Sequence, residues 1–198
     1  MALSEEVQKH RKADYPIQDY ILNRWSPRAM SGEPLSDEEI MTIFEAARWA
    51  PSSYNNQPWR FIYAKRDTEH WQTLFDLMGE FNQSWAKNAG VLVVVVSAKN
   101  FEYNAKPSVT HAFDTGAAWE NLALQTNSMG LVAHGMEGFD YDKAKQVLGV
   151  PDDYEVYAMI ALGRPGKIED LPQDLQEKEK PSERKSLDEI IMEGVFKN

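Results

Sequence analysis

The pattern of hydrophobic positions predicts a sheet covered by helices. Apolar residues with helical spacing follow a capping box at Ser36 and Glu39, and this helix stops at Pro51. A longer helical pattern over 108–129 carries small residues on one face, and the apolar run 91–96 is typical of a strand buried on both faces. Further strands are predicted at 59–64, 131–134 and 154–162, and further helices at 5–13, 17–23, 68–78, 140–148 and 187–192.

Length and composition fit one globular domain over residues 1–198. The chain has 198 residues, of which 42 % are hydrophobic, so it can bury a core without disulfides. Residues 166–198 are far more polar and end in a predicted short closing helix after Ser186. This C-terminal stretch is therefore either disordered or an arm that lies over a partner.

Charge and cysteine content exclude several classes of function. With 21 basic and 31 acidic residues the net charge is −10, which argues against a nucleic-acid partner. The absence of cysteine excludes thiol nucleophiles and thiolate metal sites, and the four histidines have no metal-ligand spacing, so no metal is expected. Redox chemistry would need a bound cofactor.

The chain has no segment typical of secretion or of membrane insertion. Its first residues are polar and mixed in charge, unlike a signal peptide. The longest apolar stretch, 89–96, is too short for a span of about 20 residues. We expect a cytoplasmic protein that contacts no membrane.

Arginines with a serine suggest a phosphate site. Arg24, Ser26 and Arg28 lie early in the chain, and Arg184 with Lys185 lies late. Guanidinium groups and hydroxyls match phosphate oxygens. Taken alone, these residues are better explained as ordinary surface charges.

The segment 51–59, here called the amide loop, is more specific. It reads Pro-Ser-Ser-Tyr-Asn-Asn-Gln-Pro-Trp and holds three amides and two serines between two prolines. Amides both donate and accept, so they can pair with the alternating carbonyl and N–H edge of a flavin pyrimidine ring. An ordinary turn explains the prolines and one Asn, but not so many amides before a strand.

The turn after the strand predicted at 131–134 can bring backbone N–H groups close to a ring system. Gly135 and Gly138 allow close approach, although a plain turn with Asp140 as helix cap is the simpler explanation. His111 and Asp114 are minor candidates on the long helix. No dinucleotide-binding or phosphate-loop glycine motif occurs, and no carboxylate pair has spacing that demands acid–base chemistry.

Taken in order, these motifs resemble the nitroreductase family of FMN enzymes over nearly the whole chain. The resemblance is carried by residues 23–28, the amide loop, residues 137–140 and Arg184. It implies an α+β fold with a mixed, mainly antiparallel sheet flanked by helices. It also implies a homodimer that exchanges C-terminal arms and holds FMN non-covalently at shared sites.

The resemblance assigns roles to individual residues. Arg24 and Ser26 would bind the phosphate and ribityl chain, Arg28 would lie by the pyrimidine edge, and Arg184 would close on the phosphate. Ser52, Ser53 and Asn55 would reach the flavin from the other subunit, and residues 136–138 would line the ring near N5. Trp25 and Gly135 differ from the residues that the family commonly has at these positions. The resemblance assigns Asp114 less specifically, as a polar residue beside the ribityl chain or ring. The segment 81–87 matches no flavin-contacting segment of the family. The full implied cofactor set is Arg24, Trp25, Ser26, Arg28, Pro51, Ser52, Ser53, Asn55, Gln57, Met136, Glu137, Gly138 and Arg184.

The activity implied is a ping-pong reaction. NADH or NADPH would reduce the flavin at N5, and a nitroaromatic, quinone or related acceptor would then reoxidise it, without a catalytic side chain. Alternatives are dehalogenation, flavin destruction, or a non-catalytic flavin-binding dimer. The sequence names neither the acceptor nor the preferred nicotinamide nucleotide.

Overall fold

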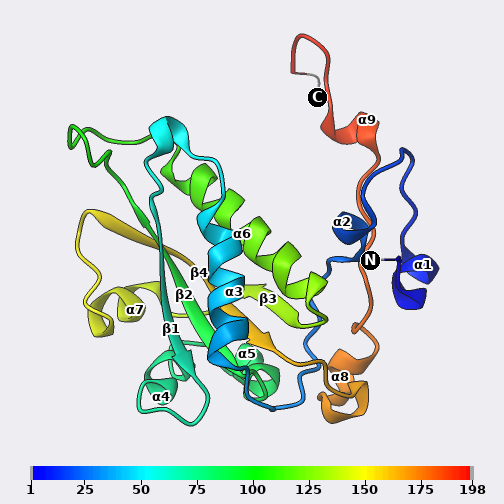
Figure 1. Cartoon of the computed structure of the whole chain (residues 1–198). Coiled ribbons are helices and arrows are strands. Elements are labelled where there is room, and N and C mark those ends of the chain that lie inside the picture. Colours follow the sequence, from blue (N-terminus) through cyan, green and yellow to red (C-terminus); the bar gives the residue numbers. More distant parts are fainter. Residues whose placement is uncertain (1, 197–198) are drawn as a thin grey trace.

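A four-stranded sheet forms the centre of the protein in the computed structural model, which describes residues 2–196 (Figure 1). The strands are β1 (Trp59–Lys65), β2 (Val91–Ala98), β3 (Val132–Met136) and β4 (Tyr154–Gly163). They lie in the order β1-β2-β4-β3, and each neighbouring pair is antiparallel. The α+β class and the mainly antiparallel sheet flanked by helices are thereby confirmed, although the sheet was expected to be mixed and the described strands pair only in the antiparallel sense.

Strand β2 divides the hydrophobic core into two parts. Its odd-numbered residues from 91 to 95 pack in one cluster, and its even-numbered residues from 92 to 96 pack in the other. All of these side chains are at most 3 % exposed. The unbroken apolar run follows from this position, because neither face of the strand meets water.

One face of the sheet is covered by α3 (Asp37–Arg48) and α6 (His111–Ser128), which also contact each other. The predicted capping box is present, since Ser36 Oγ accepts from the Glu39 amide and the Glu39 carboxylate accepts from the Ser36 amide. Ile40 and Ile43 are fully buried against this face. Among the described residues no helix is both long and apolar enough to cross a membrane.

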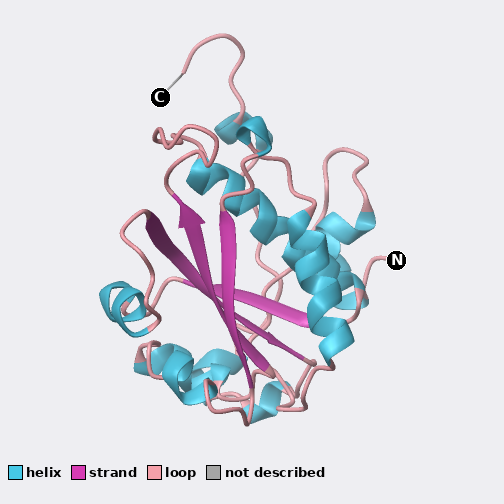
Figure 2. Cartoon of the chain, turned by 60° about the vertical axis from the view of Figure 1, so that its left-hand side comes forward, coloured by secondary structure: helices cyan, strands magenta, loops and turns pink. Residues whose placement is uncertain are grey.

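The other face is covered by α4 (Trp71–Phe75), α5 (Glu80–Ala86) and α7 (Tyr141–Val147), as Figure 2 shows. The helix predicted over 68–78 is only the short α4, and α5 was not predicted. Met78 instead forms a bridge with Phe139, and the Gly79 amide donates to the Gly138 carbonyl at 3.1 Å. These contacts with a distant segment end the helix early.

Short helices at both ends complete the chain, and the terminal helices are shorter than predicted. The N-terminal segment is fixed by the buried Asn23, whose side chain accepts from the Ser4 amide and donates to the Ala2 carbonyl. The remaining elements are α1 (Glu5–His10), α2 (Asp19–Asn23), η1 (Ser53–Asn55), η2 (Ile168–Asp170), α8 (Gln173–Gln176) and α9 (Leu187–Ile190).

The polar C-terminal stretch has an anchored part and a projecting part. Leu171, Leu175 and Glu179 are buried against the rest of the chain. Beyond them the chain runs away from the sheet towards α9 (Figure 1). We call residues 182–196 the C-terminal arm.

Gly166 provides a test of how the anchored part is attached. Its amide donates to the Ala29 carbonyl, and a Cβ at this position would lie 2.4 Å from the Met30 carbonyl carbon. Gly166→Ala should therefore lower the free energy of unfolding by at least about 2 kcal/mol, because backbone must move. Gly79→Ala is the matched control, since its nearest contact would be an ordinary 3.6 Å. Equal urea midpoints for the two variants would contradict this packing.

Candidate functional site

Two adjoining clefts lie beside α6. The inner cleft, about 490 Å³, lies between α6 and the ends of β3 and β4, and the basic cleft, about 720 Å³, lies between the N-terminal segment and the C-terminal arm. Arg24 and Glu120 line both. The two clefts therefore adjoin at Arg24 and Glu120, and most of the charged residues that line the basic cleft are cationic.

The inner cleft brings together predicted residues from distant parts of the chain. Ser26, Met136 and Glu137 all line it, across from Trp119 of α6. A Cβ at Gly135 would lie 3.2 Å from the Trp119 ring, so the glycine lets β3 and α6 approach closely. Gly135 was expected to allow close approach to a ring system, whereas Trp119 was not predicted as a lining residue, because its position depends on how α6 crosses the sheet.

The turn at Gly138 is held by a residue that sequence reasoning missed. Asn82, on α5, is 8 % exposed, and its Nδ2 donates to the Gly138 carbonyl at 3.0 Å. A Cβ on Gly138 would lie 2.9 Å from that nitrogen, so a larger residue would displace the amide. The segment 81–87 gave no signal because its partner lies 56 residues away in sequence.

The basic cleft brings Arg24 and Arg184 together, as the phosphate hypothesis requires. Arg24 has a buried Nε with no hydrogen-bond partner among the described residues, and that atom lies 3.5 Å from Glu120 Oε1. Arg11, which was not predicted, also lines this cleft. Burial, together with the positive charges of Arg184 and Arg24, lowers the pKa of Arg11 to about 10. The basic cleft thus gathers guanidinium groups with little compensating negative charge.

Arg28 faces the anchored C-terminal stretch and does not line the inner cleft. The amides of Arg28 and Ala29 donate to Glu179 Oε1 at 2.6 and 2.8 Å, and Arg28 Nη1 lies 3.8 Å from Glu179 Oε2. The buried Arg28 Nε has no hydrogen-bond partner among the described residues. Trp25 is partly buried and lines neither cleft. The closeness of Arg28 to a ring stays a prediction.

His134 supports the segment that carries these arginines. Its Nδ1 lies 3.0 Å from the Pro27 carbonyl, and its ring centroid lies 4.5 Å from that of Trp85. Burial lowers the pKa of His134 to about 4, and the nearby Arg28 charge acts in the same direction. The imidazole is therefore neutral at pH 7, and its Nδ1–H donates a hydrogen bond to the Pro27 carbonyl.

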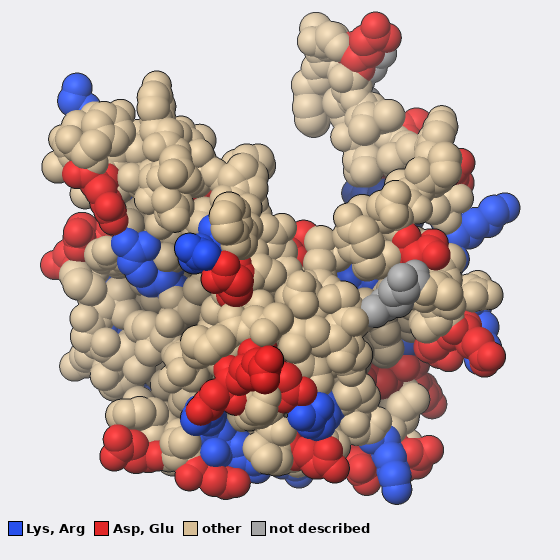
Figure 3. All heavy atoms as spheres, in the orientation of Figure 1, with Lys and Arg blue, Asp and Glu red and all other residues tan. Residues whose placement is uncertain are grey.

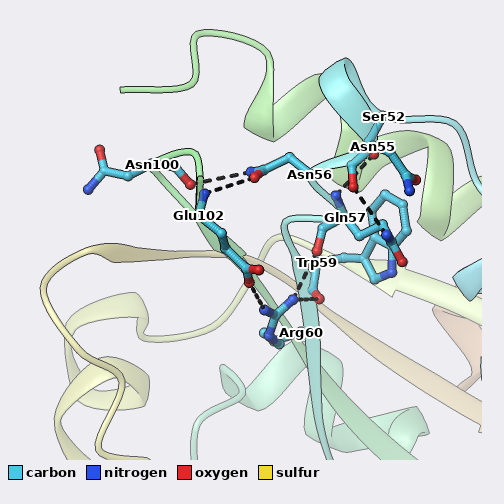
Figure 4. Close-up of polar contacts among 8 residues, drawn as sticks. All are labelled: Ser52, Asn55, Asn56, Gln57, Trp59, Arg60, Asn100 and Glu102. Carbon is cyan, nitrogen blue, oxygen red and sulfur yellow. Dashed lines mark hydrogen bonds and ion pairs between the residues drawn. The ribbon is translucent and has the colours of Figure 1, made fainter. Parts of the chain in front are cut away.

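The amide loop has a strained backbone (Figure 4). Tyr54, Asn55 and Gln57 have φ angles of 51°, 54° and 47°, in the left-handed region that favours glycine. Such strain concentrates at functional sites, where surrounding contacts hold it in place. Here the Ser53 amide donates to Asp114 Oδ2 on α6 at 3.1 Å, and Ser52 Oγ accepts from the Gln57 amide.

Two of the three amide side chains of the loop form hydrogen bonds within the described chain, and the third forms none there. Asn56, which was not predicted, donates to the Asn100 carbonyl and accepts from the Glu102 amide. Gln57 Nε2 donates to the Asn55 carbonyl. The Asn55 side chain has no hydrogen-bond partner among the described residues, so it can bind a ligand. Asn55 and Gln57 line a separate hollow of about 320 Å³, outside both clefts of their own chain.

His111 belongs to a small internal network. Its Nδ1 lies 3.0 Å from Ser97 Oγ, which also accepts from Thr115 Oγ1 at 2.8 Å. Burial lowers the pKa of His111 below its ordinary value. These contacts tie α6 to β2.

Comparison with known proteins identifies the family of the chain. Residues 21–164 match the family model described as the Nitroreductase family. The chain belongs to the nitroreductase family. A relative in Archaeoglobus fulgidus, provisionally named an NADH dehydrogenase/NAD(P)H nitroreductase, is 30 % identical over 155 residues, which cover 76 % of this chain and 86 % of that protein. An NADH dehydrogenase of Thermus thermophilus is 26 % identical, with 86 % and 92 % covered.

Solved structures of similar proteins have the same fold as this nitroreductase-family chain. One, described as an oxidoreductase containing FMN, has 45 % sequence identity and a TM-score of 0.91, with 94 % of this chain and 96 % of that chain covered. Another, a provisionally named nitroreductase from Desulfovibrio desulfuricans in complex with FMN, has 26 % identity and a TM-score of 0.71, with 93 % and 100 % covered.

The neutral state of His134 predicts a pH-dependent stability. Because the folded-state pKa lies near 4, below the ordinary 6.5, its contribution is fully present above pH 6.5 and is lost as the pH falls towards 4. The loss over this window should reach about 3 kcal/mol in urea denaturation. His134→Asn should flatten this dependence, whereas the exposed His70→Asn should retain it. A wild-type slope in His134→Asn would contradict the assignment.

Proposed function

We propose that this chain is an FMN-dependent NAD(P)H oxidoreductase that reduces nitroaromatic, quinone or related electrophilic acceptors. The observation that carries the proposal is the convergence of Arg24 and Arg184 at the basic end of a cleft lined by Ser26, Met136 and Glu137. These residues come from three separate parts of the chain. A long ligand with an anionic end and a flat apolar end suits this shape and charge.

The residues present fit FMN. The inner cleft, at about 490 Å³, is within the usual range for small-molecule sites of about 300–1,000 Å³. The buried Arg24 Nε without a hydrogen-bond partner is a donor suited to a phosphate or ribityl oxygen. Arg24 and Arg184 would hold the phosphate, Ser26 the ribityl chain, and the segment 135–137 one side of the ring.

Bound FMN would supply hydride chemistry at N5, in a ping-pong reaction that alternates NADH or NADPH with the acceptor. The chain's own residues would orient the cofactor and stabilise charge on it. Asn82 holds the Gly138 turn in place, and the neutral His134 holds Pro27, so that the two cofactor-facing segments are fixed before binding. Arg28 would oppose negative charge on the reduced ring. We assign no side chain as a proton donor or nucleophile.

We further propose a homodimer with shared cofactor sites. The amide loop lies outside the clefts of its own chain, with the Asn55 amide unpaired among the described residues and Ser52 and Ser53 beside it. Large apolar side chains are exposed at Phe113 (80 %) and Phe196 (81 %). Figure 3 shows an open hollow between the body and the C-terminal arm. A second copy that exchanges arms would cover these apolar groups.

Flavin binding by the purified protein tests whether FMN is the cofactor. The purified protein should be yellow or bind added FMN, and Arg24→Ala should raise the Kd for FMN at least about tenfold by removing a charge-assisted contact to phosphate. Fluorescence titration of the flavin-free protein measures this. Lys145→Gln, which breaks an exposed ion pair with Asp152, is the control that removes one positive charge elsewhere. The proposal fails if the wild type binds no FMN.

Mixed dimers test the shared site. Arg24→Ala and Asn55→Asp should each weaken FMN binding, and Asp tolerates the left-handed backbone at position 55. If the amide loop serves the partner's site, a dimer with one variant of each kind holds one fully intact site. Tagged heterodimers should therefore regain up to half the wild-type flavin content. Heterodimers that remain as poor as the two homodimers would rule out sharing.

The electron donor and the acceptor can be resolved with the flavin-loaded protein. Stopped-flow bleaching by NADH and by NADPH would give the donor preference, and reoxidation by a panel of nitroaromatics and quinones would give the acceptor class. Parallel lines in steady-state double-reciprocal plots are expected of a ping-pong reaction. Intersecting lines would exclude it.

A further inference from the structure

Arg11 joins three segments of the chain at the basic cleft. It follows α1, and its guanidinium group donates to three backbone carbonyls. Nη1 reaches the carbonyls of Leu22 at 2.9 Å and Arg24 at 2.8 Å, and Nε reaches the carbonyl of Ser182 at 2.8 Å. These bonds connect the N-terminal segment, the end of α2 and the start of the C-terminal arm.

The carbonyls that Arg11 binds belong to one residue proposed to hold phosphate, or lie two residues before such a residue. One is the carbonyl of Arg24 itself, and Ser182 lies two residues before Arg184. The same segment carries a second constraint, since Arg184 Nη1 donates to the hydroxyl and carbonyl of Ser182. Arg11 thus sets the relative position of two guanidinium groups that are 160 residues apart in sequence.

The charge balance of the cleft points to an anion. Arg11, Arg24 and Arg184 repel one another, and this repulsion adds to burial in lowering the pKa of Arg11. The facing carboxylates offer weak compensation, because Glu120 is half-exposed and lies 3.5 Å from Arg24, and Asp14 and Glu183 are exposed. Lys9, Lys12 and Lys185 add positive charge to the rim, and His10 faces Glu6. A bound dianion would relieve the repulsion.

We infer that Arg11 is a positioning residue for the flavin phosphate: it holds Arg24 and Arg184 in one cluster and adds a third positive charge to it. This inference rests on the FMN proposal above. Nη2 of Arg11 has no hydrogen-bond partner among the described residues, so the group retains a donor for an anion while its other nitrogens hold backbone. Arg11 takes no part in hydride transfer.

Comparing FMN with riboflavin, which lacks the phosphate, separates this role from general folding. Arg11→Gln should raise the Kd for FMN about tenfold or more, whereas the Kd for riboflavin should change less than about twofold. Arg11→Lys keeps the charge but loses the planar fork that serves separate carbonyls, so its effect should be intermediate. Lys145→Gln should match the wild type. Unchanged riboflavin affinity also shows that each variant is folded.

Further measurements extend the comparison. The salt dependence of FMN affinity should be weaker in Arg11→Gln, because one charge is missing from the site. Inorganic phosphate should compete with FMN but not with riboflavin.

The outcomes distinguish the two proposals. Equal losses of FMN and riboflavin affinity in Arg11→Gln would show a merely structural role, and no loss of either would show no role; both overturn the inference and leave the FMN proposal standing. A wild-type protein that binds neither flavin would overturn both proposals.

Discussion

The constraint on which the site depends is the repulsion between guanidinium groups held close together in a partly buried place. Nothing in the local sequence favours this arrangement, and each group would be better solvated apart. Backbone carbonyls accept from Arg11, and Glu179 accepts from the amides of the segment that follows Arg24. Packing and hydrogen bonds to neighbouring segments thus hold the guanidinium groups close together, and an anionic ligand can then stabilise their positive charges.

The same logic of support from a distance recurs along the inner cleft. Asn82 fixes the turn at Gly138, and His134 fixes the carbonyl of Pro27, each from an element covering or forming the sheet. The backbone beside the inner cleft is thus held in place by hydrogen bonds within the chain itself, which would fix it before a ligand binds. This preorganisation lowers the entropy cost of binding.

The amide loop is built on a different principle. The loop is held by Asp114 of α6, and Asn56 ties it to the 100–102 segment (Figure 4), while its Asn55 and Gln57 line a hollow outside both clefts of their own chain. In the proposed dimer, a loop held in this way would place its side chains at the partner's site in a fixed conformation.

The sequence by itself determined what depends on local patterns. The apolar run 91–96, the capping box at Ser36 and the turn residues around the strands were enough to predict a sheet covered by helices and most of its elements, because period and capping are local properties. The resemblance to the nitroreductase family supplied the α+β class and indicated Arg24, Ser26, Arg184, Met136 and Glu137, which the structure brings to two adjoining clefts. Tertiary structure alone decided the role of Arg11, the support from Asn82, the division of the amides between Asn55 and Asn56, and the turning of Arg28 towards Glu179. Each of these depends on contacts between segments far apart in the chain, and such contacts leave no periodic signal in a single sequence.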